Sequence, residues 1–468
     1  MGRRIQEKII TGFKAEDLSS DGRAVGRDGE VVIFVKGMVP GDVGTIKVFR
    51  KNRRHYEAQL ETLEQRSADY TEPKCGHFEQ CGGCKWQNLS YAKQLEFKDK
   101  QVLKAFEKIA HVSDFKREAI MGSRNEYYYR NKVEFSFSNK RWLSKEEIDS
   151  GSDFQTQNAL GFHLPRFFDK IVDINECHLI DSYSDEIRNG LRAFALDHKL
   201  SFYDIREHHG LLRNMFVRNT SDDQWMVNMV FGENDKKGIE LVMEFLKENF
   251  DKITSLNYTL NRKKNDSIGD LDTVCYHGSD HITESMGDLK FKIRPKSFYQ
   301  TNSDQAHQLY DLAKSFANLK ENELLYDLYT GTGTIALYCA DAVKQVVGIE
   351  YVDQAIVDAK ENAEANGIDN AKFFHGDMKD ILTQSFLKEH GKPDVIITDP
   401  PRAGMHPDVI EVIKNSGAQR VVYVSCNPAT QARDVDMLKE HYKLTRSRAV
   451  DMFPHTNHIE NVTLLERI

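Results

Sequence analysis

The hydrophobic pattern of the first 63 residues predicts a small β-barrel. Residues 31–35 form an unbroken apolar run, and residues 44–49 and 56–60 are two further β-type runs. Turn-forming glycines separate these runs, as is typical of short strands that close into a barrel. Residues 21–26 contain two glycines ahead of the first clear strand, and we expect a flexible segment there.

The pattern changes after this barrel. Residues 91–109 place apolar side chains on one helical face, which predicts an amphipathic helix. Residues 125–290 then mix strand-like runs at 132–137 and 225–230 with a helical stretch at 237–250. Such a mixture predicts an α+β middle domain.

From about residue 290, strands, glycine turns and helices alternate. Helical stretches such as 353–366 separate several of the strands. This alternation predicts a mostly parallel sheet with covering helices. The expected strands are 324–328, 345–349, 371–374, 394–398 and 420–425.

Length and composition agree with a multidomain α/β protein. A chain of 468 residues is too long for one core, and we expect domains at 1–63, 64–290 and 291–468, with the 91–109 helix packed on the last. No apolar run approaches the roughly 20 residues that span a bilayer. The N-terminus lacks the apolar core of a secretory signal, so we expect a cytoplasmic protein without a membrane partner.

The charge distribution leaves nucleic-acid binding open. The formal net charge of -8 argues weakly against a polyanionic partner, but binding depends on local patches. Residues 50–55 and 262–264 are basic, and residues 127–132 interleave three tyrosines with an arginine and a lysine. Aromatic rings and cations together suit a splayed single-stranded RNA loop.

Three cysteines lie close together in a glycine-bearing loop, as Cys75-X5-Cys81-X2-Cys84. Without an export signal, metal ligation explains such clustered thiols better than disulfides do. Zinc with a fourth ligand and a 4Fe-4S cluster both fit thiolate ligands. Cys177 is the best remote fourth ligand.

A nucleotide site is predicted where the first strand of the C-terminal sheet ends. Gly331 and Gly333 follow that strand and permit a close backbone approach to a ligand. The second strand ends at Glu350, which is placed to accept hydrogen bonds from ribose hydroxyls, and the third is followed by Asp377. Ala336 stands where a dinucleotide site would have its third small residue, so this turn alone leaves NAD possible.

The ends of the fourth and fifth strands carry the candidate chemistry. Asp399 begins an Asp-Pro-Pro-Arg tetrapeptide, which resembles the substrate-side motif of class I methyltransferases, and Cys426 ends the fifth strand. Carboxyl ends of parallel strands are where such sheets place active sites. A thiolate could add to carbon 6 of uracil, which makes carbon 5 nucleophilic toward a methylsulfonium. Removal of the carbon 5 proton needs a base, and spacing leaves His455, His458 and Glu460 as candidates.

Together these motifs resemble the RumA/TrmA-like RNA uridine-C5 methyltransferases over essentially the whole chain. The resemblance implies Cys426 as nucleophile, Glu460 as proton-abstracting base and S-adenosyl-L-methionine as cofactor. It also implies an N-terminal TRAM-like barrel of oligonucleotide-binding type, an α+β centre with an iron-sulfur loop, and a C-terminal Rossmann-like methyltransferase domain. The implied cofactor-binding residues are Gln300, which ends a Ser-Phe-Tyr-Gln segment, Tyr329, Glu350, Asp377 and Asp399.

The resemblance also bears on the metal and on the substrate. It favours a 4Fe-4S cluster over zinc, with Cys75, Cys81, Cys84 and Cys177 as ligands. The TRAM-like barrel and the cysteine cluster together point to 23S ribosomal RNA as the substrate, with one or two target uridines. We expect a monomer without a DNA partner. A transfer RNA uridine methyltransferase and a non-catalytic iron-sulfur RNA-binding assembly factor are the alternatives.

Overall fold

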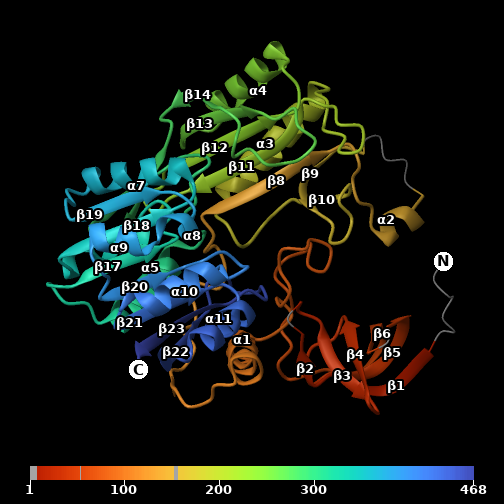
Figure 1. The fold of residues 1–468 in the computed structure, drawn as a ribbon. Helices are drawn as coiled ribbons and strands as arrows, with labels where there is room; N and C mark the ends of the chain where they lie inside the picture. The colour runs from red at the N-terminus through yellow and green to blue at the C-terminus, as the bar shows by residue number, and fades with distance from the viewer. Residues whose placement is uncertain (1–7, 20, 53, 152–156) are drawn as a thin grey trace.

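The computed structural model describes residues 8–19, 21–52, 54–151 and 157–468. In Figure 1 the N-terminal sheet (red) lies at one corner, the middle of the chain (yellow and green) forms a second sheet, and the C-terminal part (cyan and blue) forms a third. A hairpin of β15 and β16 lies between the second and third sheets in sequence. Within these ranges no helix has the length and apolar composition needed to cross a membrane.

The N-terminal sheet has six strands in the order β1-β5-β6-β4-β3-β2. Its buried apolar side chains form one small core that includes Phe13, Ile33 and Ile46. Residues 24–28 form strand β3. The first three of them lie in the segment 21–26, so the prediction of a flexible segment there was wrong. Gly26 serves close packing there, because a Cβ atom would lie 2.3 Å from the carbonyl oxygen of Lys14. The strands are β1 (Lys8–Lys14), β2 (Asp17–Leu18), β3 (Ala24–Asp28), β4 (Val31–Lys36), β5 (Val43–Lys51) and β6 (His55–Gln65).

The central sheet has seven strands in the order β10-β9-β8-β11-β12-β13-β14. Helices α3 and α4 pack against each other and against this sheet, and their apolar faces share its core. The elements are β8 (Lys132–Ser138), α2 (Lys145–Asp149), β9 (Ala159–His163), β10 (Ile171–Asp173), α3 (Tyr183–Asp197), β11 (Leu212–Asn219), β12 (Trp225–Phe231), α4 (Lys236–Asn249), β13 (Ile253–Leu260) and β14 (Thr273–Gly278), followed by the hairpin strands β15 (Ile282–Met286) and β16 (Leu289–Ile293).

The C-terminal sheet has eight strands in the order β19-β18-β17-β20-β21-β23-β22-β7. The five strands expected from the sequence are present and parallel, and β23 pairs antiparallel with both β21 and β22. The strands are β17 (Leu324–Leu328), β18 (Gln345–Glu350), β19 (Ala371–His375), β20 (Val395–Thr398), β21 (Arg420–Ser425), β22 (Tyr442–Val450) and β23 (Glu460–Arg467). The helices are α5 (Ser303–Ala317), α6 (Thr334–Cys339), α7 (Asp353–Ala365), α8 (Met378–Ile381), α9 (Gln384–His390), α10 (Pro407–Ser416) and α11 (Pro428–Leu438), with a 3-10 turn at Ala340–Ala342.

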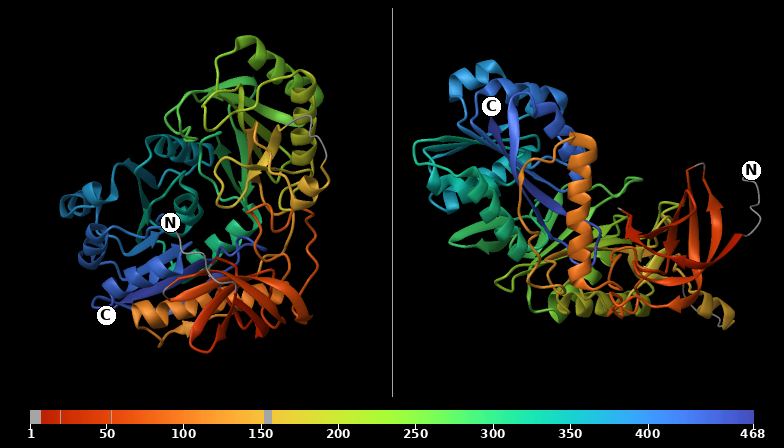
Figure 2. Two further views of the ribbon diagram at one scale, coloured as in Figure 1. Left: turned by 90° about the vertical axis from the view of Figure 1, so that its right-hand side faces the viewer. Right: turned by 90° about the horizontal axis from the view of Figure 1, so that it is seen from below.

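A segment that precedes the central sheet in sequence packs on the C-terminal sheet. Helix α1 (Tyr91–Ala105) continues into a π-helical turn (Phe106–Ala110), and strand β7 (Lys116–Arg117) pairs with β22. Phe106 is fully buried in the same core as α11, and both views in Figure 2 show α1 (orange) beside the blue C-terminal elements.

A buried ion pair fastens α1 to the end of the chain. The ammonium of Lys98 lies 2.6 Å from a carboxylate oxygen of Asp451, and neither side chain is exposed. The same ammonium donates to the carbonyl of Phe453 at 3.0 Å and lies over the ring of Trp86. Burial lowers the pKa of Lys98, while the neighbouring Asp451 opposes that shift.

Removing one partner of this pair should be strongly destabilising. We expect Lys98→Met to lower the free energy of unfolding by about 3–5 kcal/mol, because Asp451 then stays buried as an unpaired charge. Urea unfolding followed by tryptophan fluorescence would measure the change. The double variant Lys98→Met, Asp451→Leu should recover much of the loss, and a single variant as stable as the wild type would contradict the expectation.

Candidate active site

The candidate site lies where the order of the parallel strands reverses. Strands β18 and β19 lie on one side of β17, and β20 and β21 lie on the other. In such sheets ligands bind in the crevice at the carboxyl ends of the strands beside the reversal. Tyr329, Glu350, Asp399 and Cys426 stand at or just beyond those ends of β17, β18, β20 and β21.

The turn after β17 is held open by Glu350. The backbone N–H groups of Gly331 and Val352 donate to the two carboxylate oxygens of Glu350, at 3.1 and 2.9 Å. Gly331 has a φ of 55°, and a Cβ atom there would meet nothing within 4 Å. Tyr329 also has a positive φ, of 64°. The turn therefore leaves open space beside a carboxylate, which suits a ribose with two hydroxyl donors.

A second carboxylate, Asp327, lies buried beneath the turn. It accepts hydrogen bonds from Thr330 Oγ1 at 2.5 Å and from the backbone N–H of Ala336 at 3.1 Å. Burial is the main cause that raises the pKa of Asp327 to about 7, and the nearby Asp399 contributes to the rise. Asp327 was not among the predicted site residues. Its position within the same strand-to-glycine-turn motif was the available signal.

The remaining predicted cofactor residues lie at different places around the crevice. Tyr310 on α5 contacts Thr334 at 3.4 Å, and its pKa is influenced by Asp399 and by a hydrogen bond with Gln300, so these groups are close together. Burial raises the pKa of Asp399 to about 7. Asp377 instead caps helix α8, since its carboxylate accepts from the backbone N–H of Lys379 at 3.2 Å.

Cys426 lies between β21 and α11. The following residue, Asn427, caps α11 and donates from its side chain to the carbonyl of Arg402 at 3.0 Å. Burial raises the pKa of the Cys426 thiol to about 11, and the charges of Glu460 and Asp399 add to the shift, whereas Arg402 opposes it. The thiol therefore faces two carboxylates and one guanidinium.

The pairing of β23 with β21 brings Glu460 to Cys426. Ser425 is the register partner of Asn461, so the next pair along the two antiparallel chains is Cys426 with Glu460. Glu460 is buried, and burial raises its pKa well above the ordinary value, with Asp399 adding to the rise and Arg402 opposing it. A desolvated carboxylate with a raised pKa is a stronger proton acceptor than an exposed one.

The two candidate histidines have other partners. His455 is buried, its backbone N–H donates to Gln94 Oε1 at 2.8 Å, and its ring nitrogen Nδ1 lies 3.1 Å from Gln94 Nε2. His458 contacts Arg402 at 3.2 Å. Burial lowers the pKa of both histidines to about 4. Of the three base candidates, Glu460 is the one whose charge raises the pKa of Cys426.

The four candidate metal ligands are free thiols that influence one another. Charges on Cys75, Cys81 and Cys177 each raise the pKa of Cys84, although burial is the larger cause and raises it to about 12. Gln87 Nε2 donates to Cys84 Sγ at 3.2 Å. Among the described residues, no three His, Cys, Asp or Glu side chains have the arrangement of a metal-ion site.

The aromatic segment at 127–132 has mostly internal contacts. Tyr127 stacks on His455 with ring centroids 4.3 Å apart, and Tyr129 is buried and donates to the carbonyl of Pro454 at 2.9 Å. Tyr128 is half exposed and lies below the ammonium of Lys74. The segment therefore braces the turn before Glu460, and Tyr128 is the tyrosine that remains accessible for stacking.

The comparisons with known proteins agree with this geometry. Residues 279–468 match the family model described as tRNA (Uracil-5-)-methyltransferase. An uncharacterised RNA methyltransferase of Bacteroides thetaiotaomicron is 48% identical over 96% of this chain and 100% of its own length, and one of Porphyromonas gingivalis is 49% identical over 96% and 98%. The crystal structure of Pyrococcus abyssi tRNA (uracil-54, C5)-methyltransferase with S-adenosyl-L-homocysteine superposes with a TM-score of 0.75 at 30% identity, covering 97% of this chain and 99% of that one.

Proposed function

Because the chain belongs to the RNA (uracil-5-)-methyltransferase family of S-adenosylmethionine-dependent enzymes, we propose that it methylates carbon 5 of uridine in RNA through a covalent adduct on Cys426. The observation that carries this proposal is the β21–β23 register, since it sets a thiol against a buried carboxylate at the mouth of the crevice. Nucleophile and base are the two groups that this reaction requires.

The proposed reaction uses these side chains in order. The Cys426 thiolate adds to carbon 6 of the uracil ring, and the electron pair of the carbon 5–carbon 6 double bond becomes available at carbon 5. S-adenosylmethionine would supply the methyl group that carbon 5 takes up, and its sulfur would keep the electron pair of the broken bond as S-adenosylhomocysteine. Glu460 then accepts the carbon 5 proton, the double bond re-forms, and the Cys426 sulfur leaves with its electron pair. Arg402 favours the thiolate at the start and end, because its charge lowers the pKa of Cys426.

The crevice residues fit the cofactor by the chemistry of their donors and acceptors. We assign the ribose contact to Glu350, because its carboxylate borders the open space at Gly331. Tyr329 and Asp377 would lie on the adenine side of the turn, and Gln300 and Asp399 on the side toward Cys426. The glycine turn also keeps backbone atoms close enough to contact the cofactor directly.

The thiol of the free protein should react more slowly than an ordinary cysteine at neutral pH. A pKa raised to about 11 leaves little thiolate at pH 7, and that fraction grows about tenfold per pH unit until the pKa is approached. We expect iodoacetamide labelling of Cys426, followed by mass spectrometry, to rise in this way from pH 7 to 9. Glu460→Gln should speed labelling at a given pH, because it removes a charge that raises the thiol pKa. A plateau near pH 7 would contradict the expectation.

We propose a 4Fe-4S cluster as the occupant of the four-thiol loop. The four thiols are free and the other three each raise the pKa of Cys84. The Gln87 side-chain amide and the backbone N–H of Gly83 donate to the sulfur atoms of Cys84 and Cys81. Hydrogen bonds to sulfur are a usual feature of such sites. The methylation chemistry above needs no redox step, so the cluster would have a structural role.

Metal analysis would test this ligand set. Protein purified without oxygen should contain roughly four iron and four sulfide per chain, with the visible absorption of an iron-sulfur cluster. Cys177→Ser should lose most of that iron, whereas Cys275→Ser, at an exposed thiol outside the loop, should keep it. Zinc without sulfide, or iron retained in Cys177→Ser, would overturn the assignment.

We propose 23S ribosomal RNA as the substrate, with transfer RNA as the second candidate. The cysteine loop and the N-terminal β-sheet support the ribosomal substrate through the resemblance to that group of enzymes. The full-length similarity to Pyrococcus abyssi tRNA (uracil-54, C5)-methyltransferase supports the second. Because fluorine at carbon 5 cannot leave as a proton, RNA containing 5-fluorouridine should trap the adduct.

The trapping experiment distinguishes the two substrates. An adduct that survives denaturation with 23S fragments, and not with transfer RNA, would support the ribosomal assignment. The reverse result would replace the substrate and keep the reaction. No adduct with either RNA, from protein that binds S-adenosylmethionine, would overturn the proposed reaction.

A further inference from the structure

A groove runs between the cysteine loop and the hairpin that joins β9 to β10. It has a volume of about 660 Å³ and is lined on one side by Gly82, Gly83 and Lys85 and on the other by residues 162–168. A Cβ atom on Gly82 would lie 2.7 Å from Pro165, so the two walls touch at one end. We call it the hairpin groove. Its volume is within the range of small-molecule sites.

The rim of the groove presents two neighbouring aromatic rings to solvent. Phe167 is 49% exposed and Phe168 is 63% exposed. The turn that carries them is fixed, since Asp169 is buried and pairs with Arg206 at 2.7 Å, and Phe167 packs against Trp142 with ring centroids 5.9 Å apart.

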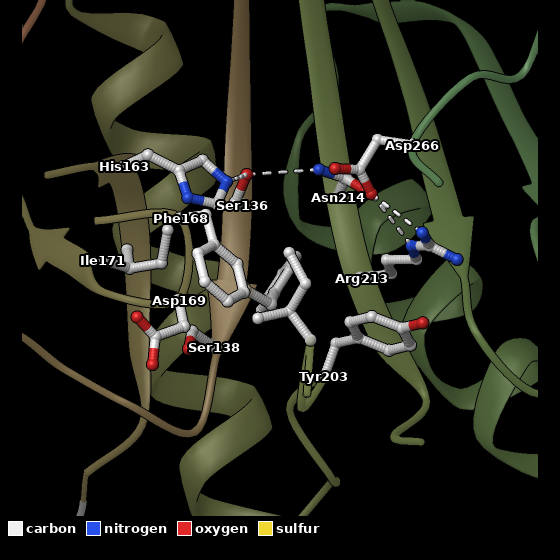
Figure 3. A pocket seen from close by; sticks show the side chains of 12 residues that line it. Ser136, Ser138, His163, Phe168, Asp169, Ile171, Tyr203, Arg213, Asn214 and Asp266 are labelled. Carbon is white, nitrogen blue, oxygen red and sulfur yellow. Dashed lines mark hydrogen bonds and ion pairs between the residues drawn. The ribbon is translucent and has the colours of Figure 1, made fainter. Parts of the chain in front are cut away.

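The other side of the turn is held by the central sheet. Figure 3 shows Phe168 and Asp169 beside a small cavity of about 20 Å³, lined by polar side chains such as Asn214 and Ser136. That cavity has room for about one water molecule and offers no competing site for a large ligand. A built turn that keeps two aromatic rings exposed indicates a partner with flat, apolar faces.

Charge identifies the class of that partner. Arg166, on the same turn, approaches the buried carboxylate of Glu57 on β6 at 3.9 Å, and Arg23 and Arg50 of the N-terminal sheet approach it at 3.3 and 3.4 Å. Arg23 also pairs with Asp21 at 2.8 Å, so two carboxylates face three guanidinium groups. This leaves a net positive charge there, in a chain of net charge -8. Exposed aromatic rings could stack on the bases of a single-stranded nucleic acid, and a net positive charge beside them would attract its phosphates.

The groove is also connected to the candidate active site. The backbone N–H groups of Lys85 and Trp86, which follow directly on the groove wall, donate to the carbonyl of His455 at 2.7 and 3.0 Å. His455 lies in the turn that leads to Glu460. The wall of the groove therefore supports the turn that leads to the proposed base.

We propose that the hairpin groove binds an unpaired segment of the substrate RNA outside the target uridine, with Phe168 stacking on a base and Arg166 contacting phosphate. The inference rests on the proposed function, because that segment belongs to the RNA that Cys426 modifies. Arg23 and Arg50 would extend the phosphate contacts onto the N-terminal sheet.

The proposal is tested by equilibrium binding of a fluorescein-labelled RNA fragment. The fragment carries unmodified uridine and has the sequence that forms the adduct when 5-fluorouridine is present. Phe168→Ala should weaken binding about tenfold, the effect of losing one base-stacking contact. Arg166→Gln should weaken binding and lower the slope of log Kd against log salt by about 1. The matched controls Leu241→Ala and Lys247→Gln, on the exposed face of α4 in the central domain, should bind as the wild type does.

Cross-linking of the same RNA carrying 4-thiouridine gives an independent measurement. Cross-linked peptides from residues 162–168 would support the proposal. Unchanged Kd and salt slope in both variants, or cross-links that avoid this turn, would overturn the groove assignment while wild-type protein still forms its adduct. Wild-type protein that forms no adduct with any RNA would instead overturn the proposed function.

Discussion

Cys426→Ala is expected to abolish methyl transfer and the 5-fluorouridine adduct together. Without a thiolate to add at carbon 6, carbon 5 of uracil stays too weak a nucleophile to accept the methyl group. Loss of a covalent nucleophile lowers turnover by about 10⁴-fold or more. Incorporation of tritium from labelled S-adenosylmethionine into RNA would measure the loss.

Two controls make the Cys426 result specific. Binding of S-adenosylmethionine should be unchanged, because the cofactor residues assigned above lie outside β21 and the turn that follows it. Cys275→Ala, at an exposed thiol on β14, should methylate as the wild type does. Methylation that survives in Cys426→Ala would show that the reaction does not pass through this thiol, and a loss shared by Cys275→Ala would indicate damage to the fold.

The parts of the fold that were predictable from sequence depend on local signals. Strand β17, the turn at Gly331 and Gly333 and the strand that ends in Glu350 are each encoded within a few neighbouring residues. Apolar runs bounded by glycine turns specify them without help from distant chain. The same is true of the strand that ends beside Cys426.

The position of the base was not predictable in this way. Glu460 reaches Cys426 because β23 inserts antiparallel between β21 and β22, a pairing that no spacing in the sequence reveals. The histidines were candidates for the same reason. The hydrogen bond that engages His455 comes from Gln94 on α1, more than 300 positions earlier in the chain.

Strand β3 was missed for a similar reason. Its glycine is needed for close packing with β1 and not for flexibility.

Long-range contacts also connect the cysteine loop with the end of the chain. The loop's last residues hold His455, α1 holds Asp451 through Lys98, and Tyr129 holds Pro454. Three separate segments thus fix the turn from which Glu460 starts β23. Burying the charged carboxylate of Glu460 is unfavourable. The contacts around this turn offset that cost and keep Glu460 in one position beside the thiol.

Glu460→Gln is expected to separate the two halves of the reaction. The amide cannot accept the carbon 5 proton, so addition and methyl transfer can proceed while release of the product RNA is blocked. With unmodified RNA a covalent protein–RNA species should accumulate, and turnover should fall by about 10²–10⁴-fold, the usual contribution of a positioned base. Denaturing gel electrophoresis with labelled RNA would show the accumulated species directly.

The accumulation of adduct is what distinguishes a base from a merely structural carboxylate. Glu466→Gln, at an exposed carboxylate on the same strand, should turn over normally and leave no adduct, and Cys426→Ala combined with Glu460→Gln should form none either. Because burial and Asp399 raise the pKa of Glu460, the wild-type carboxyl is protonated over a wider range of pH than an ordinary glutamate, and a protonated carboxyl cannot accept the carbon 5 proton. Wild-type turnover should therefore decline as the pH is lowered. A Glu460→Gln protein that releases methylated RNA at the wild-type rate would assign proton removal to another group.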